Sequence, residues 1–155
     1  MKDFVFRLPT KVIFGLGKSK EIGSICGEMN AGKAFVITGP NIGKSKLLTE
    51  LREAIEASGI ECVTCDETAA DPSVELVDEV AAVVRASGAD VLIALGVGSP
   101  IDLAKAVSVL QTHEGSVRDY MFGGGKSVTK PVMPLIAIPT TAGTGSEVSA
   151  ASVIT

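Results

Sequence analysis

The chain has 155 residues, of which 46% are hydrophobic and 21% are charged. This composition is typical of a globular domain and not of a disordered segment. The net charge of −4 and the lack of a basic tract argue against nucleic acid as a partner. No stretch reaches the roughly 18 apolar residues of a membrane helix, and the start MKDFVFRLP predicts no signal peptide. The three cysteines favour a reducing, cytoplasmic location.

The mean hydropathy of +0.39 is high for a small domain, whose large surface needs polar cover. One explanation is a core rich in alanine and valine. The other is a surface that another domain or a second copy covers. The second explanation predicts a homo-oligomer formed through an exposed apolar surface.

The chain begins with two short apolar stretches, FVFRL at residues 4–8 and KVIFG at residues 11–15, which flank Pro9-Thr10. Their residue types predict a short N-terminal β-hairpin. A weak helical pattern follows from Gly17 to Met29.

From Lys33 onward, apolar strand patterns alternate with helical ones. Asp71 is predicted to cap one helix, with Pro72 at its first position, and glycines at 59 and 88 end two helices. Residues 115–130 are predicted to form a glycine-rich surface loop. The predicted strands are residues 33–38, 60–64, 90–95 and 134–138, and the predicted helices are residues 47–58, 72–87 and 99–110.

This alternation predicts an α/β fold, a Rossmann-like parallel sheet with helices on both faces, after the hairpin. Right-handed crossovers bring all strand-to-helix loops to one edge of such a sheet. Ligands bind at that edge, beyond the carboxyl ends of the strands.

The loop Gly96-Val97-Gly98-Ser99 lies at that edge, between the most apolar strand and the next helix. Glycines allow a positive φ and a close approach of a ligand to the backbone. Ser99 is predicted to cap the helix, with Pro100 at its first position. Free N–H groups at a helix N-terminus attract phosphate, so the loop predicts a pyrophosphate site. The alternative is an ordinary tight turn.

Asp102 follows in the first turn of the same helix. The helix dipole favours an acid there, but the acid would repel phosphate on the same N–H groups. A functional Asp102 should therefore face a carboxamide or a hydroxyl. Lys105 is interpreted as a solvated charge on the helix.

A second polar loop, PTTAGTGSE at residues 139–147, follows the last predicted strand. Its hydroxyls and glycines suit ligand binding, although a simple polar turn is the alternative. Two such loops at one sheet edge favour a shared ligand site.

GVGSPIDLAKA and PLIAIPTTAGTGSEVS, preceded by FRLPTKVIFGLG, resemble the N-terminal half of the iron-containing (group III) alcohol dehydrogenases. That family is related to glycerol dehydrogenases and dehydroquinate synthases. The resemblance covers essentially all 155 residues. It implies a dinucleotide-binding domain over residues 1–155. We expect the family's C-terminal helical metal-binding domain to be absent from this chain.

The resemblance implies that nicotinamide dinucleotide is the partner of this domain. Gly96, Gly98 and Ser99 match the family's pyrophosphate loop, and Asp102 matches an acid near the nicotinamide. The threonines match the second cofactor loop, and Asp71 lies where the family has a residue near the adenine. The full set of expected cofactor-binding residues is Gly39, Asp71, Gly96, Val97, Gly98, Ser99, Asp102, Thr140, Thr141 and Thr144.

Two positions depart from the family pattern. Val97 replaces a glycine, and a positive φ there would strain a β-branched residue, while its bulk would crowd the pyrophosphate. Gly39 stands where NAD-using members often have an aspartate on the adenosine ribose. Its lack of charge, with Asn41 and Lys44 nearby, favours acceptance of NADP, whereas NAD is the alternative cofactor.

In the full-length family enzyme, Fe²⁺ or Zn²⁺ is held by one Asp and three His, and a small alcohol or aldehyde binds there. The only histidine here, His113, matches none of these ligands and is interpreted as a surface residue. We therefore expect no metal site and no alcohol oxidation by this chain alone. Two other functions remain open, a non-catalytic truncated domain that binds nucleotide weakly or self-associates, and a lyase of the dehydroquinate synthase type.

Overall fold

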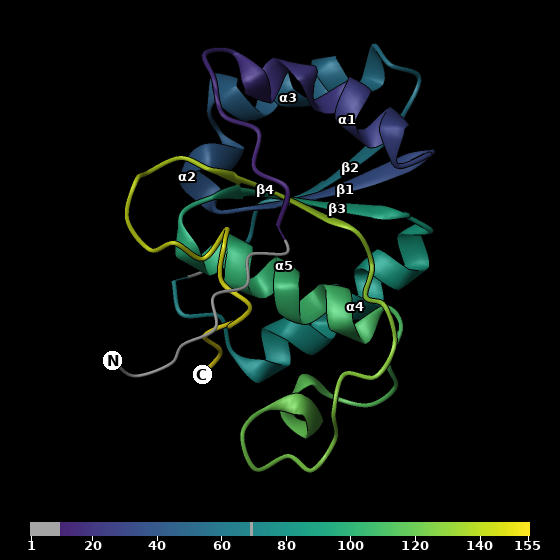
Figure 1. The fold of residues 1–155 in the computed structure, drawn as a ribbon, viewed down its shortest axis with the longest axis vertical. Helices are drawn as coiled ribbons and strands as arrows, with labels where there is room; N and C mark the ends of the chain where they lie inside the picture. Colours follow the sequence, from purple (N-terminus) through teal and green to yellow (C-terminus); the bar gives the residue numbers. More distant parts are fainter. Residues whose placement is uncertain (1–9, 69) are drawn as a thin grey trace, which may run out of the picture.

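A four-stranded parallel sheet forms the centre of the computed structural model, which describes residues 10–68 and 70–155 (Figure 1). Its strands are β1 (Lys33–Thr38), β2 (Glu61–Cys65), β3 (Val91–Gly96) and β4 (Leu135–Pro139), in the order β2-β1-β3-β4. Ala34 lies opposite Val91, and Leu92 lies opposite Leu135. The predicted Rossmann-like α/β fold is confirmed.

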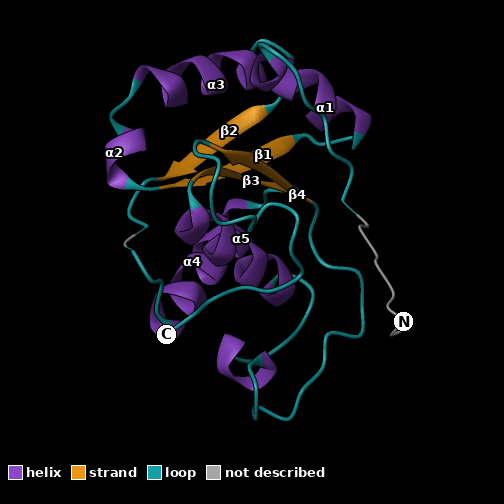
Figure 2. Cartoon of the chain, turned by 60° about the vertical axis from the view of Figure 1, so that its left-hand side comes forward, coloured by secondary structure: helices purple, strands orange, loops and turns teal. Residues whose placement is uncertain are grey.

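Helices cover both faces of the sheet (Figures 1 and 2). One layer contains α1 (Ile22–Glu28), which follows the 3₁₀ turn η1 (Lys18–Glu21), and α3 (Lys46–Glu56). The other layer contains α4 (Val74–Ser87) and α5 (Gly98–Leu110). Two short elements complete the fold, α2 (Pro40–Gly43) after β1 and the 3₁₀ turn η2 (Val117–Tyr120).

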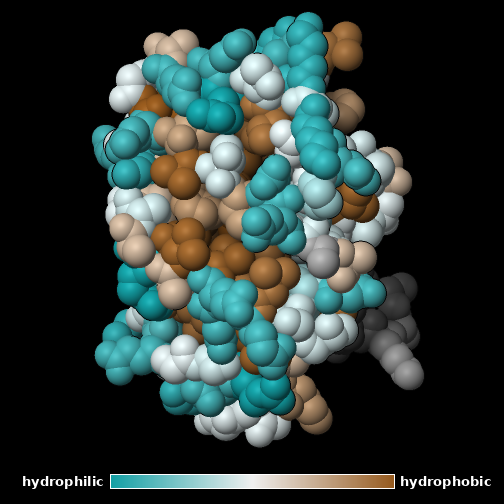
Figure 3. Space-filling model, turned by 180° about the vertical axis from the view of Figure 1, so that it is seen from behind, coloured by the Kyte–Doolittle hydropathy of each residue, from teal (hydrophilic) through white to brown (hydrophobic). Residues whose placement is uncertain are grey.

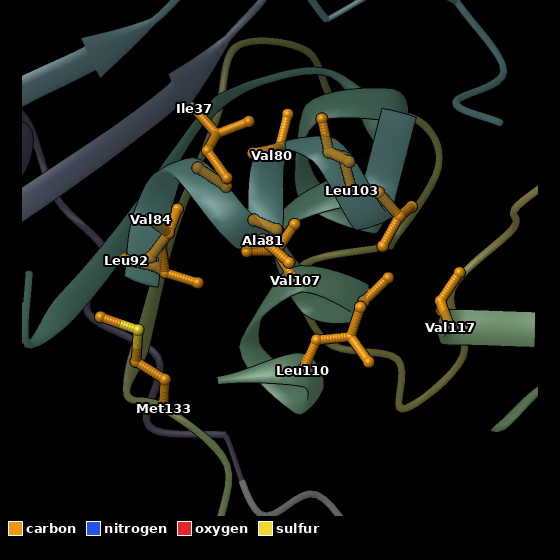
Figure 4. Packing of buried hydrophobic residues seen from close by; sticks show 14 of the residues in the cluster. Ile37, Val80, Ala81, Val84, Leu92, Leu103, Val107, Leu110, Val117 and Met133 are labelled. Atoms are coloured by element: carbon orange, nitrogen blue, oxygen red, sulfur yellow. The ribbon is translucent and has the colours of Figure 1, made fainter. Parts of the chain in front are cut away.

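Alternate residues of the central strands supply two separate hydrophobic cores. Phe35 and Leu92 face α4 and α5, where they join the cluster of Figure 4. Val36 and Ile93 point the other way, against α1 and α3. Successive strand residues face opposite sides of a sheet, so a strand that is apolar at every position needs a helical layer on each side.

Several predicted boundaries are corrected by the structure. β2, β3 and β4 each begin and end one residue later than expected. Ser73, not Asp71, is the N-cap of α4, because its side chain accepts a hydrogen bond from Leu76 N–H at 3.2 Å. Asp71 has a φ of 52°, outside the helix. Neither α2 nor η2 was expected.

The N-terminal hairpin is not supported where it can be observed. Residues 11–14 form neither helix nor strand. The predicted first strand, residues 4–8, lies outside the described residues.

His113 is buried and not at the surface as expected, with 8% of its area exposed. Its Nε2 accepts hydrogen bonds from the backbone N–H groups of Thr129 and Lys130, at 3.0 and 3.2 Å. Its Nδ1 lies 3.1 Å from the carbonyl of Val109 in α5. The ring therefore anchors the glycine-rich loop to the end of α5.

A groove of about 810 Å³ follows β4, the edge strand. Its walls include Ile22 and Ile25 of α1 on one side and Ser108 and Val109 of α5 on the other. Apolar side chains also gather in a band at mid-height on the face of the molecule shown in Figure 3. Within the described ranges, no helix is long and apolar enough to cross a membrane.

Candidate functional site

The turn from β3 into α5 requires glycine at one position and leaves little room for a side chain at a second. Gly96 has a φ of 153°, and a Cβ there would lie 2.9 Å from Pro100 Cγ. A Cβ on Gly98 would lie 3.0 Å from the Thr144 side chain. The turn therefore keeps backbone atoms uncovered at the carboxyl end of the sheet.

The N-terminus of α5 points into this turn. Its N-cap is Val97, and no side chain of the described residues caps it. The first N–H groups of a helix have no acceptor within the helix, so those of Gly98 and Ser99 are available to a ligand. The expected roles of Ser99 as the cap and Pro100 as the first residue are wrong, because α5 begins earlier, at Gly98.

Val97 does not have the positive φ that would strain it. Its φ of −88° and ψ of −153° are extended values that suit a β-branched residue. The unusual φ belongs to Gly96 instead. The side chain of Val97 is 42% exposed, so its bulk remains at the mouth of the turn.

The threonine-rich loop lies against the same turn. Thr140 N–H donates to the Gly96 carbonyl at 2.9 Å, and Thr144 lies against Gly98. Thr140, Thr141 and Thr144 are all exposed. The structure thus brings the two predicted loops together, with hydroxyls beside the free N–H groups.

Asp102 lies one turn into α5 and not in the first turn as expected, because α5 begins at Gly98. It is 93% buried, since only 7% of its area is exposed. Its Oδ1 is buried and has no hydrogen-bond partner in the described part of the chain. A buried carboxylate oxygen without a hydrogen bond is costly. This observation fits an acid that binds a ligand better than a solvated acid that only stabilises the helix dipole.

Lys105 differs from the solvated charge that was expected. Its Nζ lies 3.6 Å from Asp102 Oδ1 and donates to the Ala151 carbonyl at 2.7 Å. Only 16% of its side chain is exposed. The sequence held one signal for this role, a lysine three residues after an acid on an otherwise apolar helix.

Gly39 and Asp71 lie at the same end of the sheet but apart from this turn. Gly39 follows β1, where a Cβ would lie 3.4 Å from the Thr68 carbonyl. The Asp71 carbonyl accepts a hydrogen bond from Thr155 Oγ1 at 3.2 Å. Thr68, which sequence reasoning missed, is buried, with Oγ1 lacking a partner within residues 10–68 and 70–155.

No group of three or more His, Cys, Asp or Glu side chains suited to a metal ion occurs in the described residues. These residues therefore do not fit the family's metal.

The comparisons with known proteins agree with this geometry. The sequence model of iron-containing alcohol dehydrogenases matches residues 9–155. Choline dehydrogenase of Bacillus subtilis is 39% identical over 99% of this chain and 39% of its own length. Sulfoacetaldehyde reductase of Bilophila wadsworthia is 38% identical over 97% of this chain and 38% of its own length.

A solved structure shows the same fold. Sulfoacetaldehyde reductase from Bifidobacterium kashiwanohense, in complex with NAD⁺, has a TM-score of 0.92 and is 31% identical. The match covers 100% of this chain and 40% of that one. The chain therefore spans about two fifths of the length of these relatives. The family match covers nearly the whole chain, and the chain belongs to the iron-containing alcohol dehydrogenase family.

Proposed function

We propose that this chain forms the dinucleotide-binding part of an enzyme that transfers a hydride between a nicotinamide cofactor and a small alcohol or aldehyde. The observation that carries the proposal is the uncapped N-terminus of α5, which faces a glycine turn that a Cβ would fill. The threonine loop closes the same turn from β4.

The candidate cofactor-binding residues would have roles that follow from their chemistry. The N–H groups of Gly98 and Ser99 would hold the pyrophosphate, because helix N-termini bind anions. The hydroxyls of Thr140, Thr141 and Thr144 would add hydrogen bonds. Asp102 would orient the nicotinamide end by accepting from its carboxamide. When bound, the cofactor supplies the hydride chemistry.

The adenosine end of the cofactor would lie toward Gly39 and Asp71. Gly39 has no charge to repel a 2′-phosphate, and Asn41 and Lys44 are exposed on and just after α2. These residues support a preference for NADP. The carboxylate of Asp66 lies against Gly43, and its negative charge would disfavour a 2′-phosphate. A Lys44→Ala variant should lose NADPH affinity more than NADH affinity. A wild-type chain that binds both cofactors equally, or that prefers NAD, would refute the proposed preference for NADP.

The test of dinucleotide binding is calorimetric titration with NADPH and NADH at matched salt. Gly98→Asp should abolish saturable binding, because it places a charged side chain against Thr144 and beside the phosphate. Gly27→Asp is the matched control, since a Cβ at that exposed helical glycine meets nothing within 4 Å. A folded, monodisperse wild-type chain that binds neither nucleotide would refute the proposal.

A second candidate function is self-association by a non-catalytic domain, and the groove along β4 favours it. Among the described residues, β4 pairs with a strand on one side only, and an apolar edge strand can offer its backbone groups to a second copy. Val132, which lines the groove and is 40% exposed, would then lie in the interface. Sedimentation should show a dimer that Val132→Lys dissociates, whereas a wild-type monomer would exclude this candidate.

A further inference from the structure

The connection from α5 to β4, residues 111–134, projects below α4 and α5 in Figure 1. Its first part is attached to α4, because Val117 N–H donates to Asp78 Oδ1 at 2.9 Å. Its return limb, residues 127–132, is exposed. As far as the structure describes the chain, the hydrogen bonds of this limb all go to one side chain, His113.

The contacts of the His113 ring show where its hydrogen lies. Nε2 faces the N–H groups of Thr129 and Lys130, at 3.0 and 3.2 Å, so it must offer a lone pair and carry no hydrogen. The hydrogen of a neutral ring is then on Nδ1, 3.1 Å from the Val109 carbonyl, which can only accept. The ring is therefore neutral when it holds the limb.

A second proton on the ring has to attach to Nε2, since Nδ1 already carries one. That N–H would point at the N–H groups of Thr129 and Lys130, so three donors would meet without an acceptor. Both hydrogen bonds to the limb would be lost together. The charged ring would also need water, and a cavity of about 380 Å³ beside His113 can admit it. The limb and a ring proton thus compete for the same nitrogen atom.

Charged and titratable groups surround the ring on several sides. They belong to α4, to the residue after His113, to η2 and to the glycine-rich loop, and they are Arg85, Glu114, Asp119, Tyr120, Lys126 and Lys130. Asp119 and Lys126 pair with each other at 2.8 Å. The positive Arg85 and the negative Glu114, which line the same cavity, have opposite effects on a ring proton. The two N–H groups of the limb therefore dominate the choice of the neutral ring.

We propose that His113 is a pH-sensitive latch for the return limb. A neutral ring holds residues 127–132 at the end of α5, and a protonated ring releases them. Histidine is the side chain that ordinarily changes charge between about pH 5 and 8. Val128 and Val132 of the limb line the groove along β4, so release moves part of the wall of that groove. The latch goes beyond the proposed function, because it requires neither a dinucleotide nor catalysis.

NMR spectroscopy of the whole chain tests the latch directly. His113 is the only histidine, so the imidazole signals belong to it alone. Spectra of the ring nitrogens from about pH 8 to about pH 5.5 follow the protonation of Nε2. Over the same range, the protection of the Thr129 and Lys130 amides, corrected for intrinsic exchange, should fall roughly tenfold as each loses its acceptor. Leu92 N–H, which donates to the Pro134 carbonyl, should keep its protection.

Two variants identify the group that titrates. His113→Gln keeps an acceptor near the position of Nε2 but cannot be protonated in this range, so the protection of both amides should change by less than about twofold with pH. Glu114→Gln is the matched control, because it removes a carboxylate that lines the same cavity. This control should show the same fall in protection as the wild-type chain.

Several results would overturn the latch. Protection that stays constant while Nε2 becomes protonated would separate the ring from the limb. A ring that stays neutral down to about pH 5.5 would make His113 a fixed anchor and not a switch. A fall in protection that persists in His113→Gln, or disappears in Glu114→Gln, would assign the pH response to another group. The first two results need only the wild-type chain, so a variant that does not fold leaves the test intact.

Discussion

Helices α3 and α5 lie on opposite faces of the sheet and carry their charges in opposite ways. α3 presents two ion pairs to solvent, Lys46–Glu50 and Arg52–Glu56, each four residues apart. α5 is buried along most of its length and has one ion pair, Asp102–Lys105, nearly removed from water. A helical spacing of three or four residues therefore does not by itself indicate what a charge pair does. Burial distinguishes an ion pair on the protein surface from one that belongs to the candidate site.

The largest expected effect is on packing. Leu103→Ala should lower the free energy of unfolding by about 2–5 kcal/mol, because Leu103 is fully buried in α5 and truncation leaves a cavity. Leu47→Ala, at a residue of α3 that is 37% exposed, should cost well under half as much. Urea denaturation of both variants measures the difference, and similar losses would contradict it.

The layer of α1 and α3 contains a buried ionisable group. Burial, with smaller contributions from Cys62 and Asp90, raises the pKa of the Cys26 thiol from 9.0 to about 11. The folded protein therefore keeps this proton at a pH where the unfolded chain has lost it. Stability should fall by roughly 2–3 kcal/mol as the pH rises from about 9 to about 11. The pH dependence of urea unfolding measures this fall, which Cys26→Ala should flatten, and an equally steep fall in the variant would rule the assignment out.

The substitution of glycine by alanine should have opposite effects at the end of β3 and in α1. Gly96→Ala should destabilise the protein by about 1–3 kcal/mol, through its φ of 153° and the contact with Pro100. Gly27→Ala, in open space on α1, should stabilise by up to about 1 kcal/mol, since alanine favours helix. Thermal unfolding compares the two, and a stabilised Gly96→Ala would show that the turn does not need its glycine.

The smallest expected effect is on the surface pair. The double substitution Lys46→Ala and Glu50→Ala should change the free energy of unfolding by less than about 0.5 kcal/mol. NADH binding should not change. A clear loss of binding would mean that the charges of α3 reach the site and would weaken the contrast with α5.

The sequence was sufficient to predict the sheet, both helical layers and the joining of the two polar loops. Apolar runs such as KAFVIT and VLIALG are buried on both faces, so their continuous apolar pattern predicts a sheet that is covered on both sides. Parallel strands then placed the glycine turn and the threonines at one edge without further information.

The residues that were misjudged depend on contacts between distant parts of the chain. His113 and Lys105 are polar, and only the positions of Thr129 and Ala151 show that each is buried among backbone groups. The backbone conformation of Val97 could not be predicted, because a loop sequence does not show which of its residues takes the unusual φ. The structure places that φ on Gly96.

The strand order has a consequence for synthesis on the ribosome. β1 pairs with β2 first along the chain, but its other neighbour is β3, and β3 in turn pairs with β4 near residue 135. Contacts of such long sequence separation form slowly. Until residues 91–96 emerge, β1 has an unpaired edge, and of the second helical layer only α4 has been made. The nascent chain should therefore depend on chaperones most at that stage, before α5 can cover the second face.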